Sequence, residues 1–178
     1  MREEIRGLQQ RLGLTVVYVT HDQSEALAVS DRIVVMRNAE IAQVGTPAEL
    51  YAQPQSVFVA TFTGEANHVR GELLHSEAGL AEVALGSLRL TMPDRGLPPG
   101  PTDVVIRPEA VRILAAASAS GLPATVSRAT YLGSHTEYHL ATGIGALFAI
   151  SPDRLRRSAP GEAVTPGLDP EGIMVVRG

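Results

Sequence analysis

From Gly64 to the C-terminus, the sequence consists of short β-prone runs separated by glycine, proline and serine turns. Several short strands with turn signals between them are typical of a small barrel or sandwich. Residues 115–121, AAASASG, predict a flexible connector between two halves of this region. We therefore expect an all-β domain over 65–178, with its boundary between Gly64 and Asn67.

The first third of the chain has a different pattern, which mixes helices with apolar strands. Apolar residues at helical spacing predict a helix over 2–13. Residues 14–20 predict a strand that is apolar on both faces, as in a covered parallel sheet. Asp22 then predicts a helix N-cap, and Glu25 three residues later would complete a capping box. With a second strand over 32–36, these elements would form a βαβ unit with a right-handed crossover.

A hairpin and two short helices are expected next. Residues 41–44 should pair back on the second strand. Ala39 stands where the hairpin turn would take a positive φ, which costs alanine about 1 kcal/mol, so another turn type is expected and the register stays open. Thr46 and Glu49 predict a capping box at the start of one helix, and Ser56 begins the other.

The composition excludes several classes of protein. All 15 basic residues are arginine, so the sequence cannot contain a P-loop, which needs a lysine to reach the β- and γ-phosphates. The absence of cysteine excludes disulfides and thiolate metal sites. A net charge of −4 and 4% aromatic residues argue against an OB-type nucleic-acid groove. The charged N-terminus and the lack of a long apolar stretch predict a cytoplasmic protein.

Three parts of the sequence together resemble one protein family. The stretch VVYVTHDQSEALAVSDRIVVM (16–36) closely resembles the switch-histidine segment of ABC ATPases, particularly importer subunits of the maltose, polyamine and ferric-iron type. Residues 40–67 continue this similarity to the end of the ATPase domain. In the last third, VIRPEAVRIL, YLGSHTEYHL and APGEAV resemble the regulatory TOBE (MOP-like) domain of those subunits.

The resemblance implies a fold in two parts. Residues 1–64 would be an α/β remnant, the C-terminal segment of a P-loop ABC ATPase domain with its switch histidine. Residues 65–178 would be an all-β, OB-like TOBE domain. The resemblance further implies an ATPase subunit that couples ATP hydrolysis to solute uptake, works as a homodimer, binds membrane permease subunits and lies on the inner face of the cell membrane. A small ligand or a protein could act as regulator at the TOBE domain.

His21 and Asp22 are the candidate site residues. His21 follows a predicted strand, where ligands bind in α/β sheets; in this family the matching histidine contacts the γ-phosphate and helps hold the attacking water. The alternative is a capping or half-buried histidine with no ligand. For Asp22, helix capping is a sufficient explanation, and a contact to nucleotide or across the ATPase dimer is implied only by the family.

The remaining parts of a nucleotide site have no match in this sequence. Besides the P-loop, there is no LSGGQ-like signature and no apolar strand ending in the Asp-Glu pair that holds magnesium. The family order would place these elements before Met1, so the chain is expected to be a fragment or a truncated product that does not hydrolyse ATP alone. ATP and Mg²⁺ would bind the complete subunit. Strand 14–20 would then lack a neighbour, and we expect it to be mobile or covered by a second copy.

Other interpretations stay open at this point. The β domain could be a stand-alone module that binds a small oxyanion, as related MOP-like domains do. His135, Glu137 and His139 alternate and would share one face of a strand, but a solvated polar stripe explains them better than a metal site, and no metal is predicted. Arg107 and Glu109 are interpreted as a surface ion pair beside a proline turn.

Overall fold

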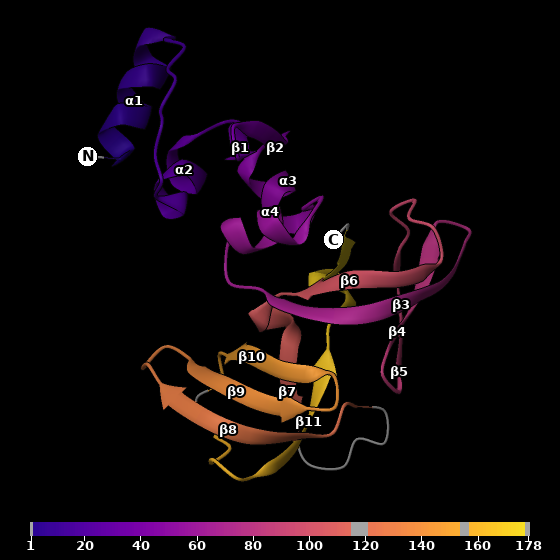
Figure 1. Ribbon diagram of the computed structural model, residues 1–178. Helices are drawn as coiled ribbons and strands as arrows, with labels where there is room; N and C mark the ends of the chain where they lie inside the picture. Colours follow the sequence, from indigo (N-terminus) through magenta and orange to yellow (C-terminus); the bar gives the residue numbers. More distant parts are fainter. Residues whose placement is uncertain (1, 115–120, 154–156, 177–178) are drawn as a thin grey trace. The chain divides into compact units, whose positions relative to one another are not determined.

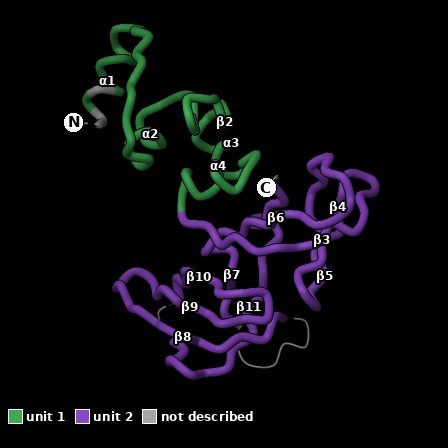
Figure 2. The backbone as a smooth tube through the Cα atoms, viewed as in Figure 1, with its two compact units in different colours: residues 1–64 green, residues 65–178 purple. Residues whose placement is uncertain are grey.

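The computed structural model describes residues 2–114, 121–153 and 157–176. The chain divides into two compact units, residues 1–64 and residues 65–178 (Figure 2). Each unit has its own hydrophobic core. The connector expected over 115–121 lies outside the described residues, apart from Gly121.

Two helices open the first unit. Helix α1 (Arg2–Leu12) ends where Gly13 takes a positive φ of 61°, a conformation that glycine adopts without strain. Helix α2 (Gln23–Val29) begins at Asp22, whose side chain accepts a hydrogen bond from the Glu25 amide. The predicted cap is therefore confirmed, but the capping box is incomplete. The Asp22 amide donates to Thr20 Oγ1 rather than to the Glu25 carboxylate.

The predicted strand over 14–20 is wrong. These residues have no regular secondary structure, and Val17 and Val19 are 88% and 90% exposed. A β-strand is stabilised by its hydrogen-bonded neighbour. The neighbour predicted for this segment, the strand over 32–36, pairs with a different segment instead. Strand β1 (Ile33–Arg37) pairs antiparallel with β2 (Glu40–Gly45), so the βαβ unit does not form.

The β1–β2 hairpin confirms the predicted pairing but not the predicted turn. Asn38 and Ala39 both have positive φ, 52° and 63°, as the two-residue type I′ turn requires. The expectation that Ala39 would force another turn type is therefore wrong. The register shifts by one residue between Val35 and Met36, just before this turn.

Two short helices complete the first unit. Helix α3 (Pro47–Ala52) starts with the full capping box between Thr46 and Glu49, and α4 (Val57–Phe62) starts with Ser56 as its cap, as predicted. Both helices face the hairpin through a small apolar core. The buried members of this core are Ile33, Val35, Leu50 and Val59.

The second unit contains two antiparallel five-stranded sheets (Figure 1). The first sheet has the order β12-β6-β3-β4-β5, so the last strand of the chain lies beside a strand from the middle of the sequence. Strand β3 is the longest and bends through a register shift between Leu73 and His75. The strands are β3 (Asn67–Glu77), β4 (Leu80–Leu85), β5 (Leu88–Pro93), β6 (Gly100–Ile106) and β12 (Ile173–Val176).

The second sheet has the order β10-β9-β8-β11-β7, and its two outer strands, β10 and β7, also lie against each other. This sheet therefore curls towards a closed barrel, as an OB-like fold requires. Short 3₁₀ turns, η1 (Pro108–Ala110) and η2 (Pro170–Gly172), lead into β7 and β12. The strands are β7 (Val111–Leu114), β8 (Ala124–Tyr131), β9 (Thr136–Thr142), β10 (Gly145–Ser151) and β11 (Ala163–Leu168).

One continuous core joins the two sheets, and one buried amide links their backbones. Asn67 Nδ2 donates to the Ile106 carbonyl (3.1 Å) and to the Phe148 carbonyl (2.8 Å), while the Phe148 amide donates to Asn67 Oδ1 (2.6 Å). Arg107 is also buried, at 2% exposure, and its Nη1 donates to the Glu65 carbonyl. The interpretation of Arg107 as a surface residue is therefore wrong.

Candidate functional site around His21

His21 lies in an exposed bend one residue before the N-cap of α2. Its side chain makes no hydrogen bond to any other residue that the structure describes. The structure thus presents an imidazole to solvent from a backbone that is fixed on its C-terminal side by a helix. Such a group can donate to, or accept from, a ligand atom that approaches the bend.

Asp22 is half-buried and serves the helix. Its Oδ1 accepts from the Glu25 amide (3.1 Å) and from Ser24 Oγ (2.7 Å). Its own amide donates to Thr20 Oγ1 at 2.9 Å. These contacts show Asp22 as a cap, and they leave its other predicted role as an expectation.

The Glu25 carboxylate closes a network around the bend. Glu25 Oε2 accepts from Tyr18 Oη at 2.7 Å and from Thr20 Oγ1 at 3.3 Å. The sequence predicts Glu25 only as part of a capping box, and it does not predict Tyr18 or Thr20 as site residues. The sequence does contain one signal for the role of Thr20: it stands two residues before the N-cap Asp22, where a threonine hydroxyl can accept a hydrogen bond from the amide of the capping residue.

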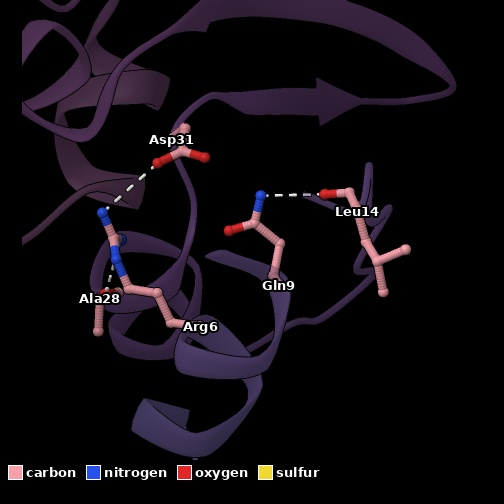
Figure 3. Close-up of polar contacts among 5 residues, drawn as sticks. All are labelled: Arg6, Gln9, Leu14, Ala28 and Asp31. Atoms are coloured by element: carbon pink, nitrogen blue, oxygen red, sulfur yellow. Dashed lines mark hydrogen bonds and ion pairs between the residues drawn. The ribbon is translucent and has the colours of Figure 1, made fainter. Parts of the chain in front are cut away.

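Two side chains of helix α1 form hydrogen bonds with residues before and after the His21 bend (Figure 3). Arg6 reaches the last turn of α2 and the residues after it, with Nη1 3.5 Å from the Ala28 carbonyl and Nη2 3.4 Å from Asp31 Oδ1. Gln9 Nε2 donates to the Leu14 carbonyl at 3.0 Å. The stretch from Leu14 to His21 is therefore anchored near both ends, although it belongs to no sheet.

Two apolar surfaces of the first unit face solvent. One is the irregular stretch 14–19, where Val17 and Val19 are almost fully exposed. The other is the outer face of the β1–β2 hairpin, formed by two cross-strand pairs. Large exposed apolar patches mark surfaces that pack against other protein. The hairpin residues concerned, each at least 42% exposed, are Val34, Met36, Ile41 and Val44.

His135 lies just before β9 and His139 lies within it, and the two rings have different neighbours. The described residues contain no group of three or more His, Asp or Glu side chains placed to hold a metal ion. His135 Nε2 lies 3.8 Å from Glu137 Oε1, whereas the His139 ring packs on Phe148 at 5.3 Å between centroids. Within the described part of the chain, no helix has the length and apolar character needed to cross a membrane.

Comparisons with known proteins agree with the fold of the second unit. Residues 104–176 match the model of the TOBE domain family. The structure is also similar to the crystal structure of the cytoplasmic molybdate-binding protein ModG, with a TM-score of 0.52 over 63% of this chain and 96% of that chain. Sequence identity to ModG is 18%, so this likeness shows the fold alone.

Relatives match the chain from end to end. The Fe(3+) ions import ATP-binding protein FbpC of Rhizobium etli is 46% identical over 176 residues, which cover 99% of this chain and 50% of that protein. FbpC of Brucella abortus is 49% identical over 85% of this chain and 43% of its own length. The spermidine/putrescine import ATP-binding protein PotA of Ruegeria pomeroyi is 37% identical over 99% of this chain and 50% of that protein.

The chain spans about half the length of the curated relatives that it matches. The matches run through both structural units, so the helical unit with His21 and the β unit belong to the same kind of protein. Both units of the chain are therefore similar to the ATP-binding subunits of ABC importers, and residues 104–176 carry a TOBE domain.

Proposed function

We propose that this chain forms part of a subunit that binds and hydrolyses ATP to import ferric iron. The observation that carries this proposal is the 46% identity to the Rhizobium etli ferric-iron subunit over nearly the whole chain, compared with 37% to the polyamine subunit. The boundary at residues 64/65 separates its two functions. Residues 1–64 contribute to the ATPase site, and residues 65–178 form the regulatory and dimerisation domain.

In this proposal His21 is the group that senses the γ-phosphate. Its exposed position in the bend before α2 supports this role, because the ring can reach a ligand without leaving a buried partner unsatisfied. Phosphoryl transfer depends mainly on positioning and on electrostatic stabilisation of the transferred group. A histidine that orients the attacking water contributes in this way. Asp22 keeps the helix capped and lies one residue away, where it can contact the partner subunit's nucleotide.

The other nucleotide contacts come from residues outside this sequence. Because the chain has no lysine, the P-loop lysine must be supplied by another segment, and Mg²⁺ binds with ATP at that segment. The exposed apolar stretch 14–19 and the outer face of the β1–β2 hairpin are the surfaces that this segment covers. Their combined exposure supports an incomplete α/β domain, since a strand-forming sequence has no sheet to join here.

The complete subunit works at the membrane through its partners. A homodimer of ATPase subunits closes on ATP and moves the permease subunits, so the protein lies on the cytoplasmic face without spanning the bilayer itself. The β unit provides a surface for a regulatory ligand or protein. The alternative of a stand-alone oxyanion-binding module stays a prediction, and thermal unfolding with molybdate and sulfate tests it.

The test uses a subunit completed with the half of the Rhizobium etli relative that this chain does not cover. ATP turnover should require the added half, and the purified 178-residue chain should show none. In the completed subunit, His21→Ala should lower kcat about 100-fold, the scale typical for loss of one electrostatic group at a reacting centre. His75→Ala, an exposed histidine in the β unit, is the matched control. Equal turnover by the two variants would reject the role of His21.

The imported ion is tested separately in permease-containing vesicles. ATP-dependent uptake of ferric iron, with no uptake of spermidine, is expected. Uptake of spermidine alone would replace ferric iron with a polyamine as the cargo and would leave the ATPase proposal intact.

A further inference from the structure

We propose that Glu25 and Thr20 are positioning residues that fix the bend carrying His21; the inference rests on the proposed phosphate-sensing role of that histidine. Neither side chain is hydrogen-bonded to the His21 ring. Thr20 and Glu25 instead form hydrogen bonds with the residues that flank His21. Their effect on the imidazole is therefore one of geometry, not of direct contact.

Thr20 forms a hydrogen bond across His21. Its hydroxyl oxygen accepts from the Asp22 amide at 2.9 Å, so the side chain before His21 is bonded to the backbone after it. This is the hydrogen-bond pattern of a threonine turn, with His21 as the central residue. A central residue held in this way has its backbone direction set by one local hydrogen bond. An alternative bend would release the Asp22 amide.

Glu25 holds Thr20 in the orientation that the turn needs. The Thr20 hydroxyl donates to Glu25 Oε2 at 3.3 Å, which directs its lone pairs towards the Asp22 amide. The same carboxylate oxygen accepts from Tyr18 Oη at 2.7 Å. Glu25 thereby joins three consecutive parts of the site: the irregular stretch, the bend and the first turn of α2.

The position of Glu25 makes this link stiff. Its amide donates to Asp22 Oδ1 at 3.1 Å, so its backbone belongs to the capped turn of α2 while its side chain reaches back across the bend. A hydrogen bond to a charged acceptor is stronger than one between neutral groups. Loss of the carboxylate would therefore remove the bonds to Tyr18 and Thr20 together, without removing the side chain that caps the helix.

The first measurement is made on the 178-residue chain and requires no nucleotide. Backbone ¹⁵N relaxation should give His21 an order parameter near 0.85, typical of a rigid backbone, and Thr20→Val or Glu25→Ala should lower it below about 0.6. Thr20→Ser keeps the hydroxyl and should restore the value of the unmodified chain. Glu40→Ala, which removes an exposed carboxylate on β2, is the control and should change nothing.

The same spectra separate positioning from a general loss of structure. The amides of α2 should stay rigid in every variant, because the Asp22 cap remains. A rigid His21 in both Thr20→Val and Glu25→Ala would overturn the inference. Fraying of α2 to the same extent as His21 in both variants would also overturn it, since the network would then only support the helix.

The second measurement is ATP turnover by the completed subunit described above. Thr20→Val should lower kcat about 10-fold with little change in KM for ATP, because misplacement of the His21 ring at the reacting phosphate affects mainly the chemical step. Thr20→Ser should be close to the unmodified enzyme. If His21→Ala lowers kcat and Thr20→Val does not, the positioning inference fails alone. If neither lowers kcat while His21 loses its rigidity in Thr20→Val, the positioning stands and the phosphate-sensing role fails.

Discussion

Replacing Asn67 with alanine should destabilise the β unit by about 3 kcal/mol. The amide makes three hydrogen bonds, two to carbonyl oxygens and one from the Phe148 amide, and Asn67 is 7% exposed. At about 1 kcal/mol net for each bond, their loss gives this magnitude. Asn67→Asp should be less stable still at neutral pH, because the new carboxylate oxygen would face the Ile106 and Phe148 carbonyls, which offer it no proton.

Urea unfolding followed by NMR signals of core residues in the β unit is the assay, because these signals report on the β unit apart from the first unit. Thr125→Ala, at an exposed strand position, is the control and should change stability by less than about 0.5 kcal/mol. The carboxyl introduced by Asn67→Asp should have a raised pKa in the folded state, so the folded state binds the proton more tightly and the stability of this variant should rise as pH falls. A loss below about 1 kcal/mol for Asn67→Ala would refute the bridging role assigned to this amide.

Three further predictions concern turns, caps and close packing. Ala39→Gly should stabilise the first unit by about 1 kcal/mol in thermal unfolding, because glycine adopts its φ of 63° without strain. The hydrogen bond from the Thr46 amide lowers the pKa of Glu49 below its ordinary value near 4.5, so the unfolded state binds more protons than the folded state. The stability that this cap contributes is therefore present above pH 4.5 and is lost as the pH falls through the lowered pKa. NMR titration of the chain, compared with Glu49→Gln, should show this loss. Gly71→Ala should cost about 1–3 kcal/mol in urea unfolding, because its Cβ would lie 2.8 Å from Leu85 Cδ2.

Helix starts could be predicted from the sequence because their signals are local. Asp22, Thr46 and Ser56 each cap the helix expected of them, and the cap and its helix lie within a few residues of one another. Strand formation over 14–20 could not be predicted in this way. A strand depends on a partner, and an apolar run is only a candidate until that partner is present.

The candidate site shows the same limit at the level of side chains. His21 and Asp22 were found from their motif, and the structure places both at the bend before α2. The contacts of the Glu25 carboxylate depend on how an irregular stretch folds back on the helix, which periodicity cannot show. The hydrogen bonds between Asn67 and Phe148 are even harder to predict from the sequence, because the two residues are 81 positions apart.

The position of β12 has a consequence for synthesis of the protein on the ribosome. Its four residues, 173–176, are buried and pair with β6, which lies about 70 residues earlier. The first sheet of the β unit therefore cannot acquire this edge until residues 173–176 have been translated and have left the exit tunnel. Loss of residues 173–176 would remove a strand from the core, so a reporter fused at Val176 is better separated from this strand by a spacer.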